Sequence, residues 1–509
     1  MNIKSFTLDD LLRRLADGWP PERNEFAAEF FNRWLACLHA AGEIEASGEN
    51  WLQGKLDLSA IRLHGSDNVA VLLVGGGGDS VERAAWDFWH RVNSTDRLVF
   101  FLLLSEAAEA QVKAKLPKVR CVWLSVEQIR KVAQSIQAGD RLKELIRSQL
   151  PLHQLLPYHI TSPVNQHMFF GRAYELDRLL YEPETSFAIA GPGRLGKTSL
   201  GLRFHKQLVL DQDPRASRCY RIDFYDCQET TNDGVAKFLA MKIEPSHRSS
   251  RVGASDLINF LRYQQGRQGG PLELLLDELD EVIHLSAFEM LAMAARQQLC
   301  RLVLCGRGNL LKAMTSEGSP LKSRIELIRL KPLDEVSARR LIVEPLADLG
   351  FKLEQPERLI ELIFHWTGRL PHLMQYYCKR LVNLTRSQGS DTIKSALVDI
   401  VRSEFETVQL FADQLESVTD TPARMVALHL LRQSDRFFTA QDVQRIVAQK
   451  GLPIDMRRTL QICDELVIHN VLAWHEEAFC IANHSLAHYV RKMRLQDNAF
   501  VPDGTLETV

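Results

Sequence analysis

The sequence predicts a multidomain α/β protein whose largest part is built on a parallel sheet. Its 509 residues exceed what one hydrophobic core usually holds. Short apolar runs alternate with amphipathic stretches in two separate regions, a pattern typical of strands and helices that follow one another along the chain. A glycine-rich turn joins one of these runs to a helix. We therefore expect an α/β architecture with several domains.

The composition is that of an ordinary globular protein. Hydrophobic residues make up 45% and charged residues 25% of the chain. The 62 Lys and Arg residues nearly balance the 64 Asp and Glu residues, and nothing resembles a basic or acidic tail. The nine cysteines contain no C-x-x-C, so we expect neither disulfides nor zinc. The longest apolar runs, 69–74 and 98–104, are far shorter than the ~20 residues that span a bilayer. Because no secretion signal is evident, we expect a cytoplasmic protein without membrane contact.

Residues 1–150 are predicted to form a first domain. Its first 45 or so residues have helical periodicity. Strand runs at 56–63, 69–74, 98–104 and 120–124 then alternate with helices at 81–91, 106–115 and 126–133, which predicts a mainly parallel sheet.

This order of elements faintly resembles restriction-endonuclease folds, with Asp57 near the first acidic position. Strand 69–74 lacks the Glu-x-Lys whose groups would bind Mg²⁺. We therefore expect a sensor or adaptor domain, with a degenerate nuclease as the alternative.

The remaining boundaries follow from changes in pattern. Prolines in residues 151–167 predict a linker. Residues 168–333 contain predicted strands at 186–190, 218–225, 272–276, 301–305 and 325–330, separated by helices, and residues 334–412 are predicted to form a helical lid. In residues 413–495, helices at 423–431, 440–448 and 455–468 precede two strands around 475–477, which predicts a winged helix before a tail at 496–509.

The glycine-rich turn follows strand 186–190 and opens a helix. It reads Gly191-Pro192-Gly193-Arg194-Leu195-Gly196-Lys197-Thr198-Ser199 and matches the phosphate-binding P-loop pattern. Glycines let several backbone N–H groups converge on phosphate oxygens, and the helix N-terminus adds partial positive charge. Lys197 supplies a charge to the β and γ oxygens, and the Thr198 hydroxyl supplies a ligand to Mg²⁺. The motif predicts an ATPase that binds ATP, ADP and Mg²⁺.

A second motif stands about 80 residues farther along. The apolar run Leu274–Leu276 ends in Asp277 and Glu278, at the strand end where ligands of open α/β sheets bind. Asp277 is expected to hold Mg²⁺ through water, and Glu278 to polarise the attacking water as the catalytic base.

A third motif lies about 20 residues before the P-loop. Phe170-Gly171-Arg172-Ala173-Tyr174-Glu175-Leu176 resembles the signature with which AAA+ and STAND ATPases line the adenine pocket. Together with the P-loop it makes the chain similar to bacterial and archaeal AAA-like ATPases grouped with STAND regulators, over about residues 168–385 and loosely to 493. The fold that this implies is a P-loop NTPase core with a helical lid and a C-terminal winged helix.

The resemblance also implies roles for residues outside these motifs. Arg307, at the end of strand 302–306, would read the γ-phosphate, and Arg324 would be an arginine finger offered to a neighbouring subunit. Pro371 would pack on the adenine. His484 faintly resembles the histidine by which some STAND winged helices hold ADP.

The predicted winged helix raises the question of DNA binding. Residues 421–494 contain ten Lys and Arg against seven Asp and Glu, with only Arg457 and Arg458 at the start of the expected recognition helix. DNA-binding proteins usually carry a fuller basic stripe. We therefore expect an intramolecular clamp, as the resemblance implies, with DNA binding as the alternative.

The sequence thus leads to three functional hypotheses. The first is an ATP-driven switch that couples nucleotide state to self-association or to a protein partner, and by fold analogy it would serve regulation, often antiviral defence. The second is a DNA-binding initiator or loader like the archaeal origin-recognition ATPases. The third is a nucleotide-binding scaffold with little turnover.

Overall fold

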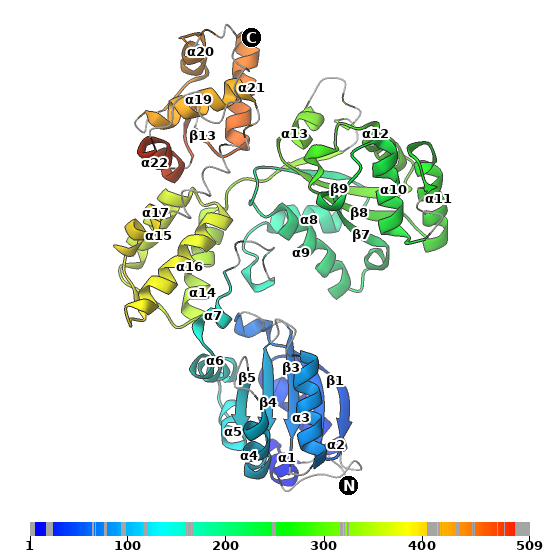
Figure 1. Cartoon of the computed structure of the whole chain (residues 1–509), viewed down its shortest axis with the longest axis vertical. Coiled ribbons are helices and arrows are strands. Elements are labelled where there is room, and N and C mark those ends of the chain that lie inside the picture. The colour runs from blue at the N-terminus through cyan, green and yellow to red at the C-terminus, as the bar shows by residue number, and fades with distance from the viewer. Residues whose placement is uncertain are drawn as a thin grey trace. The chain divides into compact units, whose positions relative to one another are not determined.

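The computed structural model describes most of the chain. The described residues are 6–16, 24–63, 66, 68–75, 79–92, 98–116, 121–158, 160, 164, 166–246, 251–315, 319, 321–322, 325–404, 415, 418, 420–433, 437–449, 451, 454–475, 477–482 and 484–493. They form two compact units (Figure 1). Unit 1 comprises Met1–Tyr158, Asn165–Phe169 and Arg340–Lys352, and unit 2 comprises His159–Val164, Phe170–Arg339 and Leu353–Val509. Within the described ranges, none of the helices combines the length and apolar character needed to cross a membrane.

Unit 1 is built on a five-stranded sheet in the order β1-β2-β3-β4-β5. Its strands are β1 (Ala41–Gly48), β2 (Trp51–Asp57), β3 (Val69–Val74), β4 (Val99–Leu103) and β5 (Cys121–Ser125). Neighbours from β1 to β3 pair antiparallel, and neighbours from β3 to β5 pair parallel. Strands β3 and β4 are buried along their whole length, as parallel strands covered on both faces are.

The helices of unit 1 follow the predicted alternation from β3 onward. They are α1 (Leu8–Ala16), α2 (Asn24–Cys37), α3 (Asp79–Val92), α4 (Glu106–Lys115), α5 (Val126–Ala133), α6 (Ala138–Gln149) and α7 (Leu152–Leu155).

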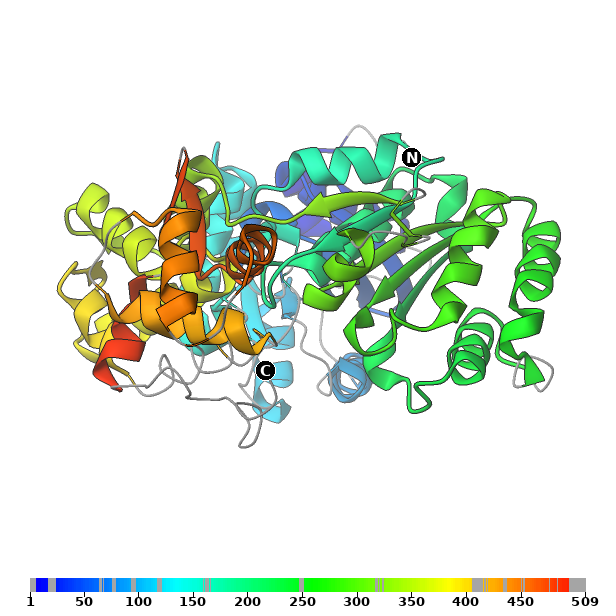
Figure 2. The ribbon, with the colours of Figure 1, turned by 90° about the horizontal axis from the view of Figure 1, so that it is seen from above.

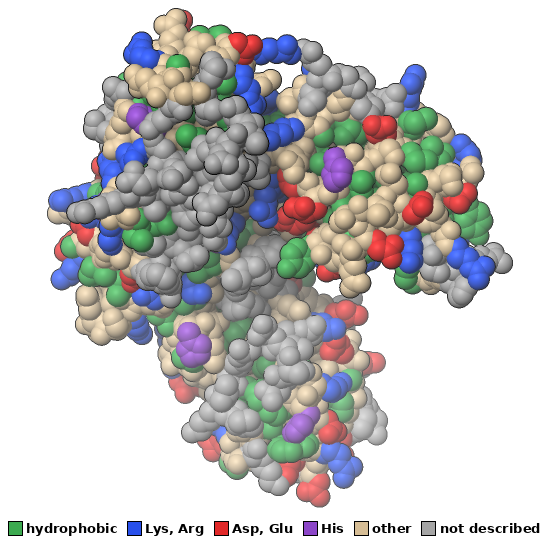
Figure 3. Space-filling model, turned by 45° about the horizontal axis from the view of Figure 1, so that its top comes forward, with side chains coloured by type: hydrophobic (Ala, Val, Ile, Leu, Met, Phe, Trp, Pro, Cys, Tyr) green, Lys and Arg blue, Asp and Glu red, His purple; other side chains and the backbone are tan. Residues whose placement is uncertain are grey.

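Hydrophobic, acidic and basic side chains are mixed over the face of this unit seen in Figure 3. This mixture agrees with the balanced charge of the whole chain.

The predicted strand 56–63 is wrong. Strand β2 ends at Asp57, and Ser59–Ile61 form a short 3-10 helix. The Oδ1 atom of Asp57 accepts a hydrogen bond of 2.9 Å from the N–H of Ser59. Such a local contact between side chain and backbone competes with strand pairing and turns the chain.

The expectation of a mainly parallel sheet is also wrong, because the sequence did not reveal strand β1. Most residues of β1 are exposed, and its sequence Ala-Gly-Glu-Ile-Glu-Ala-Ser-Gly has little apolar character. A two-residue turn returns the chain into β2, and its Asn50 has a φ of +62°, a conformation that asparagine tolerates. A polar edge hairpin of this kind carries almost no hydrophobic periodicity.

The second half of helix α14 (Glu335–Asp348) belongs to unit 1, where ion pairs hold it. The Nζ atom of Lys143 lies 2.6 Å from Oδ1 of Asp348, and both side chains are largely buried. Arg147 donates a hydrogen bond of 3.1 Å to the carbonyl of Asp348, and Arg62 pairs with Glu344. The segment predicted as the start of the lid therefore contributes residues to unit 1 as well.

Unit 2 contains the predicted five-stranded parallel sheet, in the order β10-β6-β9-β8-β7. The five strands that the sequence predicted are present, with ends shifted by one or two residues. They are β6 (Phe187–Ala190), β7 (Cys219–Asp223), β8 (Leu272–Asp277), β9 (Cys300–Gly306) and β10 (Glu326–Arg329). Because they are parallel, Ala190, Asp277 and Gly306 end at the same edge of the sheet, where ligands of such folds bind.

Helices cover both faces of this sheet (Figures 1 and 2). They are α8 (Ala173–Tyr181), α9 (Lys197–Leu210), α10 (Asn232–Ile243), α11 (Leu257–Gln268), α12 (Ser286–Arg296) and α13 (Gly308–Thr315). Leucines of β8 and β9 pack with residues of α10, α11 and α12 in one continuous core. The burial of these strands on both faces explains why they read as uninterrupted apolar runs.

A buried ion pair, which no pattern in the sequence indicates, lies within this part of unit 2. The Nη1 atom of Arg301 is 3.0 Å from Oε2 of Glu273, with the two side chains 3% and 4% exposed. Arg301 also donates to the carbonyls of Thr185 at 2.7 Å and Leu179 at 2.8 Å. These bonds tie strand β9 to the chain segment that leads into β6.

Replacing Arg301 with methionine is expected to lower the free energy of unfolding by about 3–5 kcal/mol, because Glu273 would remain buried without its partner. Urea denaturation followed by circular dichroism measures this change. The exposed pair of Arg339 and Glu357 provides the control. Arg339→Met should leave the unfolding midpoint unchanged, since exposed ion pairs contribute little. Equal effects of the two substitutions would contradict the prediction.

The rest of unit 2 is largely helical. Helices α15 (Pro356–Thr367), α16 (Pro371–Ser387) and α17 (Leu397–Ser403) follow α14. Beyond them lie α19 (Thr421–Arg432), α20 (Ala440–Gln449), α21 (Met456–Ile468), β13 (Leu472–His475), β14 (Ala478–Ile481) and α22 (His484–Lys492), which we call the C-terminal segment. Strands β13 and β14 form an antiparallel hairpin. Three helices followed by two strands is the order that the sequence predicted here.

Candidate nucleotide-binding site

The predicted phosphate cradle is the turn between β6 and α9. Residues 191–199 all lie in this turn or in the first turn of α9. Gly196 has a φ of +92°, while a Cβ atom built on it would meet nothing within 4 Å. Glycine is therefore required there by backbone conformation and not by lack of space. The N-terminus of α9 presents backbone N–H groups, which suit an anionic phosphate.

Lys197 is buried at the start of α9. Its Nζ atom donates hydrogen bonds to the carbonyls of Gly191 at 2.9 Å and Pro192 at 2.8 Å. Burial, followed by the nearby positive charge of Arg307, lowers the pKa of Lys197. An ammonium group has three N–H donors, so one donor remains for a phosphate oxygen. The negative charge of a nucleotide would also stabilise the ammonium form.

Thr198 and Asp277, the two predicted magnesium ligands, lie together. The Thr198 hydroxyl donates a hydrogen bond to the carboxylate of Asp277, and Asp277 Oδ1 accepts one of 2.9 Å from the N–H of Glu278. Burial raises the pKa of Asp277, and the bond from Thr198 opposes that shift. Among the described residues, no three His, Cys, Asp or Glu side chains gather around a metal position. One carboxylate and one hydroxyl beside a phosphate cradle fit Mg²⁺, which takes its remaining ligands from phosphates and water.

Glu278 and Arg307 face each other across the end of the sheet. The Nη2 atom of Arg307 lies 3.2 Å from Oε2 of Glu278, and both side chains are partly exposed. The Cζ atom of Arg307 would be 3.8 Å from a Cβ built on Gly193 of the cradle. Arg307 therefore lies between the cradle and Glu278. The φ of Glu278 is +52°, and strained backbone of this kind is often found at functional sites.

Asp280 positions Arg307, a role that the sequence analysis did not assign. Its carboxylate accepts hydrogen bonds from the N–H groups of Arg307 at 2.5 Å and Asn309 at 2.9 Å. The side chain of Asn309 returns a bond of 3.0 Å to the carbonyl of Asp280. These contacts anchor the beginning of α13, which directly follows Arg307. The acidic residue three positions after Asp277 was the available signal.

The residues predicted to line the adenine pocket lie close to the cradle. Gly171 and Arg172 both have left-handed backbone, with φ values of +72° and +65°. The guanidinium of Arg172 donates to the carbonyls of Leu195, at 3.5 Å, and Lys331. Phe170 is almost fully buried. Arg172 thus braces the cradle through its side chain, a contact that the motif in the sequence did not indicate.

Pro371 is the first residue of α16, and the Nε2 atom of its neighbour His372 lies 3.0 Å from the carbonyl oxygen of Ile160. The backbone N–H of Leu333 donates a bond of 3.1 Å to the carbonyl of Arg369, which joins the chain before α14 to the turn between α15 and α16. Burial, together with the positive charge of Arg194, lowers the pKa of His372 to about 4. His372 is therefore a neutral group near Arg194 that the sequence analysis missed. Arg324, the predicted finger, lies outside the described residues.

The C-terminal segment packs against the loop that carries Arg307. The Nε2 atom of His469 would lie 3.4 Å from a Cβ built on Gly308, and Lys312 of α13 is 3.9 Å from Glu465 of α21. His484, the residue compared with the ADP-holding histidine, instead stacks on His365 of α15, with ring centroids 4.2 Å apart. In this arrangement His469, and not His484, lies beside Gly308, the residue that follows Arg307.

Acidification is expected to weaken the packing around His469. Burial, followed by Lys312, Lys197, Arg307 and Arg424, lowers the pKa of His469 from 6.5 to about 4. The unfolded chain therefore binds more protons between these two values, and stability that is complete above pH 6.5 is lost as the pH falls toward 4. For this one group, the loss between pH 7 and pH 5 is about 2 kcal/mol.

Urea denaturation at pH 7 and pH 5 measures this effect. His469→Gln should remove about that much of the pH dependence, whereas the same change at exposed His284 should leave it intact. If both variants keep the full dependence of the wild-type protein, His469 does not carry it.

The model of the family described as Novel STAND NTPase 1 matches residues 157–494, more than half of the chain. Among solved structures, the chain is similar to the Walker-type ATPase PABY2304 of Pyrococcus abyssi, with 18% identity and a TM-score of 0.48 over 66% of this chain and 99% of that one. A comparison with curated proteins finds no match.

Two further solved structures are similar over comparable lengths. The ORC2 protein of Aeropyrum pernix is 14% identical, with a TM-score of 0.42 over 64% of this chain and 94% of that one. The RuvB Holliday junction branch migration motor of Thermotoga maritima is 15% identical, with a TM-score of 0.34 over 63% and 95%. Because these TM-scores are below 0.5, family assignment rests on the family model.

Proposed function

Because this chain belongs to the novel STAND NTPase 1 family, we propose that it is an ATP-hydrolysing conformational switch whose C-terminal segment responds to the bound nucleotide. The proposal assigns residues 168–333 to the ATPase core, 334–412 to the lid and 413–495 to a winged helix. Residues 1–150 would form the sensor or adaptor domain. The change of nucleotide state would be passed on through a protein partner or through self-association.

Each residue of the site has a chemical role in this proposal. Lys197 and the backbone of the cradle bind the phosphates, while Thr198 and Asp277 would hold Mg²⁺, which neutralises phosphate charge when bound. Glu278 accepts a proton from the attacking water. Arg307 pairs with the γ-phosphate oxygens through its planar guanidinium. To do so it must exchange its contact with Glu278 for one with the nucleotide, which leaves Glu278 available to the water.

The observation that carries the proposal is the position of residues Gly306–Gly308. Arg307 faces the cradle and Glu278, and the next residue, Gly308, lies against His469 of the C-terminal segment. A shift of Arg307 toward a γ-phosphate would therefore disturb the packing of α21. Loss of the γ-phosphate would restore it, so one short loop can couple hydrolysis to the C-terminal segment.

Hydrogen–deuterium exchange tests this coupling directly. We expect amides of α13 and α21 to exchange at different rates with ADP and with a non-hydrolysable ATP analogue. The difference should vanish in Lys197→Ala, which removes the phosphate-binding charge, and persist in Lys206→Ala on the same helix. Helix α11 serves as the internal reference. The switch proposal fails if α21 exchanges at one rate in every nucleotide state of a protein that binds both nucleotides.

DNA binding is the alternative output of the C-terminal segment. Arg458, one of two arginines at the start of α21, forms an ion pair with Asp420. That pair must break before Arg458 can contact a phosphate, so we expect duplex DNA to leave ATP turnover unchanged. DNA-stimulated hydrolysis that is lost in Arg457→Ala with Arg458→Ala would favour the initiator or loader hypothesis.

Light scattering with ADP and with the ATP analogue measures self-association in the same preparations.

A further inference from the structure

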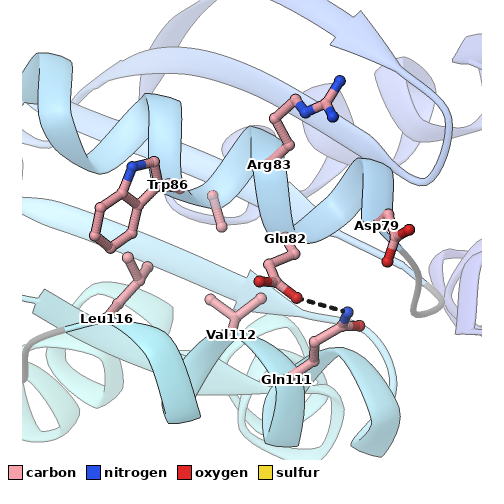
Figure 4. Close-up of a pocket in the computed structure, with 8 residues that line it drawn as sticks. Asp79, Glu82, Arg83, Trp86, Gln111, Val112 and Leu116 are labelled. Carbon is pink, nitrogen blue, oxygen red and sulfur yellow. Dashed lines mark hydrogen bonds between the residues drawn. The ribbon is translucent and has the colours of Figure 1, made fainter.

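A groove between helices α3 and α4 lies in unit 1. It encloses about 470 Å³, which falls within the range of binding pockets. Both helices contribute to its walls (Figure 4). The residues that line it are Asp79, Glu82, Arg83, Ala85, Trp86, Gln111, Val112 and Leu116.

The two ends of the groove differ in chemistry. At one end the indole of Trp86 faces Leu116 and Val112 (Figure 4). At the other end Glu82 accepts a hydrogen bond of 3.4 Å from the side chain of Gln111, and Asp79 stands at the start of α3. Arg83 also belongs to the lining, but its guanidinium points away from the carboxylate of Glu82 (Figure 4). An occupant that matches this groove therefore needs an apolar part and, beside it, a positively charged part.

Trp86 is not needed for the packing of α3 onto the sheet. Helix α3 buries Val81, Ala85, Phe88, Trp89 and Val92, while Trp86 remains 48% exposed. The indole is nevertheless held in place, because its ring lies 4.2 Å from that of His90, whose Nδ1 is 3.0 Å from the Trp86 carbonyl. A large aromatic side chain held in this way loses little conformational entropy on binding, a property of interface hot spots.

The outer surface of α4 allows another helix to approach closely. Ala107, Ala110 and Ala114 are exposed at helical spacing, so methyl groups make up part of the exposed surface of α4. On the described outer surfaces of the two helices, acidic side chains outnumber basic ones. The acidic residues are Asp79, Glu82, Asp87, Glu106 and Glu109, and the basic ones are Arg83, Arg91 and Lys113.

We propose that the groove between α3 and α4 binds an amphipathic basic helix of a partner protein. The helix places a large apolar side chain against Trp86, Val112 and Leu116. One turn away it places a Lys or Arg beside Glu82 and Asp79. Glu82 and Trp86 are themselves one turn apart on α3, about 6 Å, which is the spacing of side chains at i and i+4 on the incoming helix. This binding site is separate from the nucleotide chemistry proposed above.

Fluorescence anisotropy with the full chain tests the proposal. The probe is a labelled 20-residue alanine- and glutamine-based helix with leucines and, one turn away, lysines on one face. Two control peptides replace the lysines with glutamate or the leucines with alanine. We expect saturable binding of the first peptide and at least tenfold weaker binding of both controls.

Protein variants locate the binding. Trp86→Ala and Glu82→Lys should each weaken the Leu/Lys peptide at least tenfold, with melting curves that show both variants folded. Asp87→Lys is the matched control, because it makes the same kind of charge change on α3 outside the groove. It should bind the peptide as the wild-type protein does.

Three results would overturn the proposal. The first is no saturable binding of the Leu/Lys peptide. The second is equal weakening by Glu82→Lys and Asp87→Lys, which would indicate general charge attraction. The third is a change of oligomeric state in Trp86→Ala without peptide, because it would identify a second copy of the chain as the occupant.

Discussion

Replacing Glu278 with glutamine is expected to lower the rate of ATP hydrolysis by about 10²–10⁴-fold, the usual contribution of a general base. Glutamine has nearly the same shape but does not accept the proton of the attacking water. Lys197, Thr198 and Asp277 remain, so nucleotide affinity should change little. Turnover measured under saturating ATP, together with equilibrium binding of a fluorescent ATP analogue, separates the two effects.

The neighbouring acidic residue Glu281 provides the matched control. Its side chain is exposed, and Glu281→Gln should leave turnover near the wild-type value. If Glu278→Gln also keeps full turnover while Lys197→Ala abolishes binding, Glu278 is not the base. Should the wild-type protein bind ATP without hydrolysing it, the scaffold hypothesis would replace the switch.

Replacing Arg307 with alanine is expected to lower turnover by about 10²–10³-fold, the effect of removing one donor that stabilises transition-state charge. Arg307 is the positive group between Gly193 and Glu278, so its loss should also reduce the preference for ATP over ADP. Affinity for ADP should change less, because Lys197 and the cradle bind the phosphates that both nucleotides share. Turnover and the ratio of the two dissociation constants measure these effects.

Two further variants make the Arg307 experiment specific. Arg307→Lys keeps the charge but loses the planar pair of donors, so we expect only partial recovery. Arg296→Ala removes an exposed arginine of α12 and should behave as the wild-type protein. An unchanged ratio of ATP to ADP affinity in Arg307→Ala would remove Arg307 as the reader of the γ-phosphate.

The parts of unit 2 that the sequence predicted are those with a strong local signal. Strands β8 and β9 are buried on both faces and therefore read as unbroken apolar runs. The cradle was recognisable because its glycines and Lys197 must occur at set positions for chemical reasons. Since parallel strands end at one edge of a sheet, Asp277 was expected at the edge where ligands bind, and the resemblance to STAND ATPases implied the same position for Arg307.

The errors arose where the hydrophobic pattern of the sequence does not identify the type of element. Strand β1 is polar and exposed, so no alternation marks it, and its pairing with β2 depends on a turn at Asn50. The predicted strand 56–63 contained buried residues such as Leu58 and Leu63. Their burial comes from a short helical turn that Asp57 begins through its side chain, and hydrophobicity alone does not distinguish that turn from a strand.

The residues of the phosphate cradle, the acidic pair at the end of β8 and the five strands of the parallel sheet in unit 2 can all be derived from the amino-acid sequence, because each is marked by a motif of set spacing or by a continuous apolar run. The contact of Arg307 with Glu278, the anchoring of α13 by Asp280 and the position of His469 beside Gly308 required the folded structure. These contacts join residues from different elements, and their existence depends on how helices pack in three dimensions. No spacing along the chain encodes them.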